Sequence, residues 1–315
     1  MDIRQLQYFV ALYEEGSVTR AARRMHVVQP AISQQIKRLE ADFGVQLFER
    51  AAHGTAPTTA ARDFYAVCLS ILNQLRQAEA VLREASRQPA GRLTLGAQAS
   101  MNQHIVPTAL SQFHARYPAI AISARDGYRA DLVDWLNRGE IDFALLSATQ
   151  EKLHLASLTL CQESLVAVGH PDTLAGRDAM PGEALAGFKL VLHSRSKSLR
   201  TLIDNQFGLH GLDVRPDLEI DALPSVLALV RQPGWLSIVP RTAVAPDAAQ
   251  DGLAWLPLRK PSLHRDVMAA WSPQRPPAVY MAPFLELLRL GLAGVQGVTL
   301  AGRPAQPLDG ARAGG

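Results

Sequence analysis

Apolar positions near the start of the chain follow the period of an amphipathic helix. The residues that share one face of a helix over positions 3–14 are Leu6, Phe9, Val10 and Tyr13. Gly16 is expected to close this helix, and Ser17 is a candidate N-cap for a short second helix over residues 18–25. A tight turn at residues 26–27 then leads to a third helix.

The third helix is predicted from about Pro30, a favourable residue in a first helical turn, to Phe43, with Gly44 ending it. Its expected buried stripe consists of Ile32, Ile36, Leu39 and Phe43. The polar side chains left facing outward are Gln29, Ser33, Gln34, Lys37 and Arg38. Because such side chains read base edges or hold phosphates in a major groove, the two helices predict a helix-turn-helix. Residues 47–58, with His53 and Gly54 at their turn, suit the two strands of a wing.

A long helix without Gly or Pro is predicted from Thr59 to Ser86. Its apolar residues recur at alternating spacings of three and four, which is the pattern of a coiled-coil seam. The seam consists of Ala61, Phe64, Cys68, Ile71, Leu75, Ala78, Leu82 and Ala85. A helix packed only on its own domain would show a broader stripe, so we favour pairing between two chains. Cys68 is then interpreted as a small apolar seam residue rather than a redox sensor.

The C-terminal two-thirds of the chain alternates strands and helices in β-α-β-α-β order, which predicts a parallel, doubly wound sheet. Strands are expected at 92–97, 119–123 and 141–146, with helices at 102–116 and 128–138. The pattern restarts with strands at 165–168, 190–192, 218–220 and 235–239 and helices at 198–207 and 225–231. A strand at 266–271 and a helix at 278–290 complete the first part. Two α/β lobes joined by crossings near 161–165 and 260–266 indicate a cleft of the periplasmic-binding-protein type.

These elements predict an α+β multidomain chain. Its parts are a winged helix-turn-helix at 1–58, a linker and dimerisation helix at 59–88, a hinge at 89–92, an effector-binding domain at 93–294 and a Gly-, Ala- and Pro-rich tail at 295–315, expected to be mobile. Within the effector-binding domain, lobe I takes residues 93–162 and 266–294, and lobe II takes 163–265.

The distribution of charge says more than the composition. The chain is 48% hydrophobic and 19% charged, as is ordinary for a globular protein, and its formal charge of +3 alone implies no nucleic-acid partner. Yet the segment from residue 17 to 38 contains no acidic residue, and its basic residues are Arg20, Arg23, Arg24, Lys37 and Arg38. Such a cluster is typical of a surface for an anionic partner such as a phosphate backbone, although a solvated helical face is the alternative.

The segment SVTRAARRMHVVQPAISQQIKRLEADFGVQLFER, followed by PTTAA, resembles the winged helix-turn-helix of LysR-type transcriptional regulators. The resemblance implies that the DNA-contacting face holds Gln29, Pro30, Ser33, Gln34 and Lys37; Arg38 and, in the wing, His53 complete the predicted set. Val28 stands where the family usually has a Ser or Thr that caps the helix and contacts phosphate. Gln34 replaces a common Arg, which should shift base preference from guanine towards adenine. Ala61 stands where a Gly is usual.

The C-terminal part resembles the effector domain of the same family through RLTLG, NRGEIDFALL, LVAVGHP and LSIVP. Candidate effector contacts follow the ends of predicted strands and are Ser100, Asn102, Tyr128, Ser147, His193, Ser194 and Ser196. By resemblance these loops line the inducer pocket, and inducers are often carboxylates, which free helix N-terminal amides also favour. Some of these residues, such as Ser100 and Ser196, could instead only cap a helix. Residues 232–235 replace the glycine pair that is usual before the IVP strand, so we expect a bulkier pocket floor.

The sequence therefore predicts a cytoplasmic DNA-binding regulator without a cofactor, not an enzyme. Its expected partners are a double-stranded DNA operator, a small anionic effector, further copies of itself in a dimer and a tetramer, and RNA polymerase if it activates. No GxSxG, HExxH or Walker loop occurs, and the nine histidines show no metal-ligand spacing. No apolar run approaches about 18 residues, and acidic residues interrupt the first apolar stretch, so neither a membrane partner nor a signal peptide is expected. The alternative is a two-lobed solute-binding protein or enzyme with an accessory helical domain, which the missing signal peptide disfavours.

Overall fold

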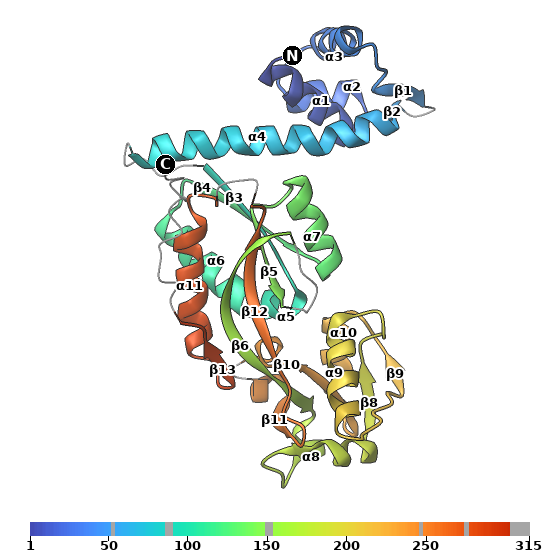
Figure 1. Cartoon of the computed structure of the whole chain (residues 1–315), viewed down its shortest axis with the longest axis vertical. Coiled ribbons are helices and arrows are strands. Elements are labelled where there is room, and N and C mark those ends of the chain that lie inside the picture. The colour runs from blue at the N-terminus through green and yellow to red at the C-terminus, as the bar shows by residue number, and fades with distance from the viewer. Residues whose placement is uncertain (52–53, 86–90, 149–153, 246–247, 274–276, 303–315) are drawn as a thin grey trace. The chain divides into compact units, whose positions relative to one another are not determined.

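The computed structural model describes residues 1–51, 54–85, 91–148, 154–245, 248–273 and 277–302 (Figure 1). The chain separates into two compact units. Unit 1 contains Met1–Arg92 and Asp134–Ile141, and unit 2 contains Leu93–Val133 and the described residues from Asp142 onward.

The main part of unit 1 is a helical bundle that carries a two-stranded wing. Its elements are α1 (Ile3–Glu15), α2 (Val18–Arg24), α3 (Gln29–Phe43), β1 (Phe48–Ala51), β2 (Gly54–Pro57) and α4 (Thr59–Ala85). The wing strands pair antiparallel, with Phe48 opposite Pro57 and Ala51 opposite Gly54. This arrangement confirms the predicted helix-turn-helix, wing and long helix.

Local sequence accounts for most of the helix ends in unit 1. Asp2 Oδ1 accepts the N–H of Gln5 at 2.8 Å while Gln5 Oε1 accepts the N–H of Asp2 at 3.0 Å, which forms a capping box at α1. Gly16 and Gly44 end α1 and α3 in the left-handed conformation, with φ of 57° and 65°. Ser17 occupies the N-cap position of α2 but makes no side-chain cap bond, so the cap predicted there is wrong.

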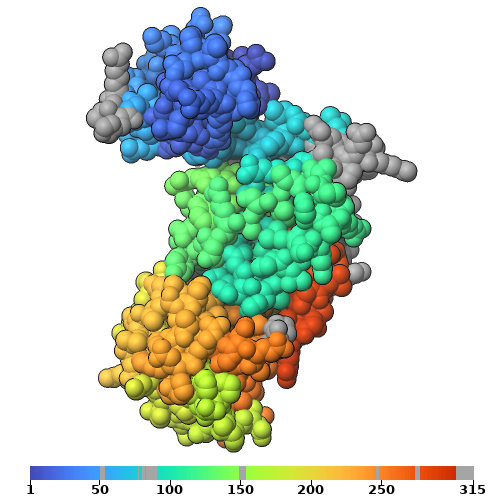
Figure 2. Space-filling model, turned by 180° about the vertical axis from the view of Figure 1, so that it is seen from behind, coloured from blue at the N-terminus to red at the C-terminus, as the bar shows by residue number. Residues whose placement is uncertain are grey.

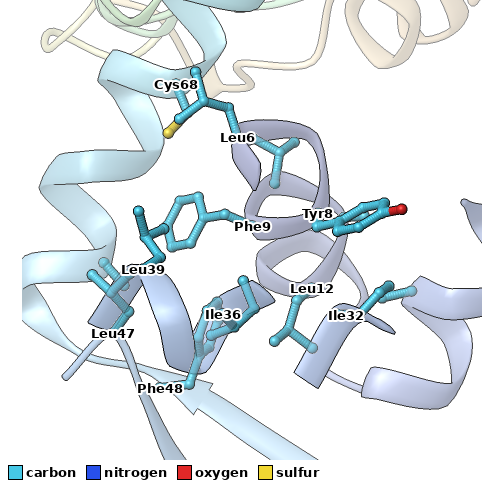
Figure 3. Packing of buried hydrophobic residues seen from close by; sticks show 14 of the residues in the cluster. Leu6, Tyr8, Phe9, Leu12, Ile32, Ile36, Leu39, Leu47, Phe48 and Cys68 are labelled. Carbon is cyan, nitrogen blue, oxygen red and sulfur yellow. The ribbon is translucent and has the colours of Figure 1, made fainter. Parts of the chain in front are cut away.

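The core of unit 1 forms around Phe9 of α1, which is 0% exposed. Its ring centroid lies 4.8 Å from that of Phe64 on α4 and 5.5 Å from that of Phe48 on β1. Figure 3 shows that side chains from α1, α3, α4 and the wing point toward one another here. The prediction that Phe43 is buried is wrong: it is 61% exposed, because it lies in the last turn of α3, beyond the reach of the core that covers Ile32, Ile36 and Leu39.

Two α/β lobes share one mixed sheet and belong to unit 2, apart from residues 91–92 and 134–141 of lobe I, which fall in unit 1. Lobe I starts with β3 (Gly91–Ala97), α5 (Ala99–Gln103), α6 (Ile105–Arg116), β4 (Ile120–Asp126), α7 (Arg129–Arg138) and β5 (Phe143–Ser147). The strand β6 (Ala156–Gly169) runs on into lobe II, and β12 (His264–Trp271) and α11 (Met281–Ala293) return to lobe I. β3 and β5 pair in parallel as predicted, whereas β12 lies antiparallel between β5 and β6, so the sheet is not purely parallel.

Lobe II places helices on both faces of its strands. Its larger elements are β8 (Lys189–Leu192), α9 (Ser198–Leu209), α10 (Leu223–Leu229), β10 (Trp235–Pro240) and β11 (Ala254–Arg259). Its short elements are α8 (Pro171–Leu174), β7 (Met180–Pro181), η1 (Gly182–Gly187), β9 (Leu218–Glu219), η2 (Arg241–Ala243) and η3 (Ala248–Asp251). Along β6, Leu165 and Ala167 join the cluster that contains Phe207 of α9, while Val166 and Val168 join the one that contains Val226 of α10. This alternation is the two-residue period of a strand buried on both faces, which explains its continuous apolar run.

Three element predictions in unit 2 need correction. The helix predicted over 102–116 is two helices that meet at His104, because Pro107 in the first turn of α6 cannot follow a helical Gln103 without a clash. The strand predicted at 165–168 extends over Ala156–Gly169, since only its second half is continuously apolar. Within the predicted tail, Val298–Leu300 form β13, which pairs antiparallel with β6, while residues 303–315 lie outside the described part.

Candidate nucleic-acid interface and ligand site

The exposed face of α3 carries the polar residues that the sequence singled out. Ile32, Ile36 and Leu39 are at most 5% exposed, and this burial fixes the opposite face of the helix outward. On that outer face, Gln29, Pro30, Gln34, Lys37 and Arg38 are exposed and Ser33 is half-buried. His53 lies outside the described residues. One surface of α3 therefore offers amide, hydroxyl, ammonium and guanidinium groups of the kind that contact base edges and phosphates.

The basic residues around α2 and α3 differ in their ion pairing. Arg24 Nη1 lies 2.5 Å from Glu14 Oε2, and Arg20 Nε lies 3.5 Å from Glu15 Oε2. The hydrogen bond to Glu14 raises the pKa of Arg24, against the opposing effect of its burial. Within the described ranges, no ion pair is found for Arg23, Lys37 or Arg38. The acids just before the basic segment thus pair with Arg20 and Arg24, and they leave Arg23 and the two cations of α3 unpaired.

The first turn of α3 is open to solvent. Val28 is its N-cap residue, is 71% exposed and provides no side-chain cap. The side-chain amide of Gln29 donates a hydrogen bond to the hydroxyl of Thr19 on α2. The backbone N–H groups of this turn therefore have no side-chain cap from Val28, and α2 orients one of the predicted base-reading residues.

The wing is anchored to the junction of α1 and α2. Thr55 donates its N–H to the carbonyl oxygen of Gly16 at 3.0 Å. Gly54 has φ +127°, and a Cβ built on it would lie 2.3 Å from the same oxygen. Only glycine permits this approach, so the turn holds the wing against the helix-turn-helix.

The apolar seam of α4 divides into two halves. Ala61 and Cys68 are buried in the core of unit 1, and Phe64 and Ile71 pack against that core. Further along the helix, Leu75 is half-buried, Ala78 is exposed and Leu82 is 72% exposed. The first half is thus occupied within the chain, and the second half offers apolar surface to a partner.

In unit 2, Ser100 lies over a buried charged cluster. Ser100 is 5% exposed, and its Oγ accepts a hydrogen bond from Arg265 Nη2 at 2.6 Å. The Nε of Arg265 donates to Glu163 Oε1 at 2.7 Å. The other oxygen of Glu163 accepts from the N–H of Thr242 at 3.0 Å and from its hydroxyl at 2.7 Å. Residues from α5, β6, η2 and β12 therefore meet in one network, three of whose members had not been predicted.

Tyr128 of lobe I meets lobe II through a second set of contacts. Its hydroxyl donates to the carbonyl oxygen of Asp221 at 3.2 Å, and Lys197 Nζ lies 3.6 Å from the centre of its ring. The Asp221 carboxylate accepts from the N–H of Ser194 at 2.9 Å and from its hydroxyl at 3.0 Å, and Ser194 Oγ lies 3.0 Å from Ser196 Oγ. Burial alone would raise the pKa of Asp221, but the hydrogen bonds from Ser194 and the charge of Lys197 lower it. The candidates Tyr128, Ser194 and Ser196 are thus brought together.

His193 responds to charges from both sets of contacts. Burial lowers its pKa, and the charges of Arg265 and Lys197 act in the same direction against that of Asp221. Its Nδ1 is buried and has no hydrogen-bond partner among the described residues. A neutral imidazole with an unused nitrogen can donate to or accept from a ligand, depending on its tautomer.

Two other candidates are held by the fold itself. Asn102 Nδ2 donates to the carbonyl oxygen of Ala97 at 3.1 Å and to Asp126 Oδ1 at 2.9 Å. Ser147 donates its N–H to Gln98 Oε1 at 2.7 Å, and its carbonyl oxygen accepts from Arg129. Both positions shape the ends of β3, β4 and β5: the side-chain amide of Asn102 is engaged by these bonds, whereas those of Ser147 involve its backbone.

The sequence offered little sign of Arg265, Glu163 or Thr242 as site residues. Arg265 and Glu163 are 102 positions apart and belong to no shared motif, so only the pairing of β6 with β12 reveals their contact. The one usable signal was charge within otherwise apolar strands. Among the described residues, no group of three or more His, Cys, Asp and Glu could hold a metal ion, and no helix is long and apolar enough to cross a membrane.

Two family descriptions match the chain. Residues 3–62 match the bacterial regulatory helix-turn-helix protein of the lysR family, and residues 86–293 match the LysR substrate binding domain. Together they span both the helix-turn-helix with its wing and nearly all of the two-lobed part.

Curated relatives are similar over most of their length. The DNA-binding transcriptional dual regulator OxyR of Escherichia coli is 26% identical over 298 residues, which cover 93% of this chain and 97% of that protein. The nitrogen assimilation regulatory protein nac of Escherichia coli is 28% identical over 244 residues, which cover 77% and 79%.

Solved structures share the fold. Full-length OxyR from Pseudomonas aeruginosa matches with a TM-score of 0.72 at 23% identity, over 95% of this chain and 98% of that one. Full-length CbnR in complex with its target DNA matches with a TM-score of 0.67 at 24% identity, over 92% and 100%.

Proposed function

Because the chain belongs to the LysR family of DNA-binding transcriptional regulators, we propose that α3 reads its operator and that a small anionic effector in unit 2 controls this binding. The exposed face of α3 is the observation that carries the proposal. It combines amides that can reach base edges with Lys37 and Arg38, for which the described part of the chain holds no ion pair. Unpaired cations beside base-reading side chains suit a phosphate backbone better than they suit a solvated surface.

The experiment is a salt titration of DNA binding with the full-length protein. The probe is a fragment selected from the genomic DNA of its source organism, and the variant is Lys37→Ala with Arg38→Ala. Each lost phosphate contact should reduce the slope of log affinity against log salt by about 0.9. The double variant should therefore bind weakly and with a slope reduced by about 1.8 per protomer.

The matched control removes the same charge elsewhere in unit 1, through Arg4→Ala with Arg76→Ala. Its affinity and slope should stay close to those of the wild type. Equal behaviour of the two double variants would refute the role of the α3 face and leave only a general effect of charge.

We further propose that the second half of the α4 seam pairs two chains. Leu75, Ala78 and Leu82 supply the surface, whereas Phe64, Cys68 and Ile71 serve mainly the core of their own unit. Pairing would present two copies of α3 to a dyad-symmetric operator, and contacts between effector-binding domains would build a tetramer. The regulator would act in the cytoplasm, with RNA polymerase as a partner where it activates.

The effector site is proposed around His193, whose pKa responds to Lys197 on one side and to Arg265, the hydrogen-bond partner of Ser100, on the other. Burial, Arg265 and Lys197 lower the pKa of His193 and Asp221 raises it, so two cationic groups and one carboxylate act at this position. An anionic ligand would find a hydroxyl, an imidazole and an ammonium group there. Tyr128 from lobe I and Ser194 and Ser196 from lobe II complete the proposed site, and Asn102 and Ser147 shape its lobe I side.

The effector should act by non-covalent binding rather than by thiol oxidation. Several curated relatives are named hydrogen peroxide-inducible genes activators. This chain has two cysteines, Cys68 and Cys161, and both are buried. Burial raises the pKa of each thiol to about 12, so the reactive thiolate is scarce at neutral pH. Neither cysteine is therefore suited to react with peroxide.

A further inference from the structure

Glu14, in the last turn of α1, joins three helices of unit 1. Its Oε1 accepts a hydrogen bond from the hydroxyl of Tyr65 on α4 at 2.7 Å, and its Oε2 lies 2.5 Å from Arg24 Nη1 on α2. Burial and the bond to Glu14 raise the pKa of Tyr65, so the phenol keeps the proton that it donates. Each carboxylate oxygen of Glu14 is therefore bound by a different helix.

These polar bonds add direction to an apolar contact. The rings of Tyr13 on α1 and Tyr65 on α4 stack with centroids 4.0 Å apart and planes inclined by 11°. Together with the core around Phe9, this contact packs α1 and α4 into one body (blue in Figure 2). Apolar contact is non-directional, whereas a hydrogen bond weakens when its distance and angle change. Glu14 therefore restrains rotations of α4 that the aromatic contacts alone would tolerate.

The start of α4 is held separately from Glu14. The hydroxyl of Thr58 accepts the N–H of Ala61 at 3.2 Å and donates to the carbonyl oxygen of Gln46 at 2.9 Å. Tyr65 lies about two helical turns further along α4. Because two points on a straight helix define its direction, the bond between Tyr65 and Glu14 determines the direction in which α4 leaves the helix-turn-helix.

The length of α4 increases the effect of a change in this direction. Leu82, in the proposed pairing surface, lies about 25 Å beyond Tyr65 along the helix axis. A change of about 10° in the direction of α4 would therefore move Leu82 by about 4 Å. That displacement is comparable to the rise of about 3.4 Å between base pairs. The distance between two paired copies of α3 thus depends on how firmly α4 is held at Tyr65.

The ion pair with Arg24 extends the connection to α3. Arg24 is the last residue of α2 and lies just before the turn that leads into α3. Earlier in α2, the hydroxyl of Thr19 accepts a hydrogen bond from the side-chain amide of Gln29 in the first turn of α3. Glu14 therefore connects the helix that is proposed to pair two chains with the helix that is proposed to read DNA.

We propose that Glu14 is a positioning residue that ties α4 to α2 and thereby sets the spacing between operator half-sites that a dimer prefers. This inference rests on the proposed function, since it assumes that α4 pairs two chains and that α3 reads DNA. The role requires no contact between Glu14 and DNA. Because the ion pair with Arg24 is partly exposed to solvent, its loss should change the stability of unit 1 little.

The test measures how DNA affinity of the full-length protein depends on half-site spacing. The half-site is taken from the footprint on a fragment selected from the genomic DNA of the source organism. Synthetic duplexes carry two dyad-related copies of it, with their separation varied in steps of one base pair, and a duplex with a single copy is the reference. The wild-type protein should bind one separation about tenfold more tightly than its neighbours.

Two variants remove the bonds of Glu14 one at a time. Glu14→Gln removes the charge that holds Arg24, and Tyr65→Phe removes the hydroxyl while its ring can still stack on Tyr13. Each should reduce the preference for the best spacing several-fold, because α4 then takes a wider range of directions. Affinity for the single half-site should stay that of the wild type, since the exposed face of α3 is unchanged.

Matched controls make the same chemical changes elsewhere in α1. Glu15→Gln removes a carboxylate whose ion pairs among the described residues are with Arg20 and Arg24 of α2. Tyr8→Phe removes a phenolic hydroxyl that points away from the side chain of Phe9 (Figure 3). Both controls should keep the spacing preference of the wild type.

The outcomes separate the inference from the proposed function. A merely structural role of Glu14 would weaken binding to all duplexes equally, and that result would overturn the inference alone. Wild-type protein that binds every spacing equally, but more tightly than a single half-site, would also overturn it alone. Wild-type protein that binds two half-sites no more tightly than one would overturn the proposed pairing as well. A preference that falls in both variants and persists in both controls supports both proposals.

Discussion

At the scale of single residues, the position of the wing depends on Gly54. Its φ of +127° is unfavourable for any residue with a side chain, and a Cβ built on it would lie 2.3 Å from the carbonyl oxygen of Gly16. Gly44 also has a positive φ, of 65°, but nothing lies within 4 Å of a Cβ built on it. Comparison of the two glycines therefore separates the cost of the backbone conformation from the cost of the steric contact.

Replacement of each glycine by alanine measures that difference. Gly44→Ala should cost about 1 kcal/mol, which is the ordinary penalty of the left-handed conformation. Gly54→Ala should cost roughly 2–3 kcal/mol and should weaken DNA binding, because the wing must move away from Gly16. Hydrogen exchange of the amides in β1 and β2 of the full-length chain gives both values. Equal costs for the two variants would show that the wing is not held by this contact.

Residue identity alone located the charged residues but did not show which of them are paired. The sequence located the basic segment and the outward face of α3 correctly, since helical periodicity and solvent exposure follow from pattern. It could not show that Glu14 and Glu15 pair with Arg24 and Arg20, because that pairing depends on how α1 and α2 pack. It likewise could not place Arg265 beside Ser100, 165 positions away.

At the scale of elements, α4 has two roles along one apolar stripe. Periodicity predicted the seam, but a spacing of three and four does not reveal which partner covers each residue. The structure assigns Ala61 and Cys68 to the core around Phe9 and leaves Leu82 exposed. Dimer pairing is therefore expected from about Leu75 onward.

Lysine substitutions in the two halves of the seam should affect different properties of the protein. Leu82→Lys should leave the stability of unit 1 unchanged and weaken dimerisation about a hundredfold, since two leucines per dimer lose burial and like charges face each other. Ile71→Lys should instead destabilise unit 1, because an ammonium group would enter its core. Sedimentation velocity over a range of concentrations, with thermal unfolding of each variant, measures both. A Leu82→Lys protein that dimerises like wild type would refute the proposed pairing surface.

Elements were predictable where one periodic signal dominated. The ends of α1 and α3 were predicted within one residue because a glycine in the left-handed conformation terminates each. β6 was predicted too short because its first half carries polar residues among the apolar ones. That half is a strand because β12 pairs along it. β13 was missed because three residues of a Gly- and Ala-rich segment form a strand only by pairing with β6.

At the scale of the whole molecule, β6 and β12 connect the two lobes of unit 2, and Glu163 and Arg265 lie on these strands. A ligand at Ser100 would therefore act beside the connections about which the lobes can move. It can shift the arrangement of the lobes only by the difference between its affinities for the two arrangements. Control of DNA binding then requires that those arrangements differ in how they present two copies of α3.

The modest charge of the chain makes oligomerisation important for DNA affinity. With a formal charge of +3, and with Arg20 and Arg24 paired within the chain, nonspecific attraction to DNA should be weak. Two copies of α3 linked through α4 can compensate, because the second copy binds at a high effective concentration. A monomeric variant should therefore lose most operator affinity even with an intact α3.

The most direct test of the central claim is footprinting of the full-length protein on a fragment selected from genomic DNA of its source organism. The wild-type protein should protect two dyad-related half-sites whose centres are separated by about 10.5 base pairs or a multiple of it. That protection should disappear in the Lys37→Ala, Arg38→Ala protein and persist in the Arg4→Ala, Arg76→Ala control. Protection without half-sites, or protection that survives loss of Lys37 and Arg38, would show that paired copies of α3 do not read the operator.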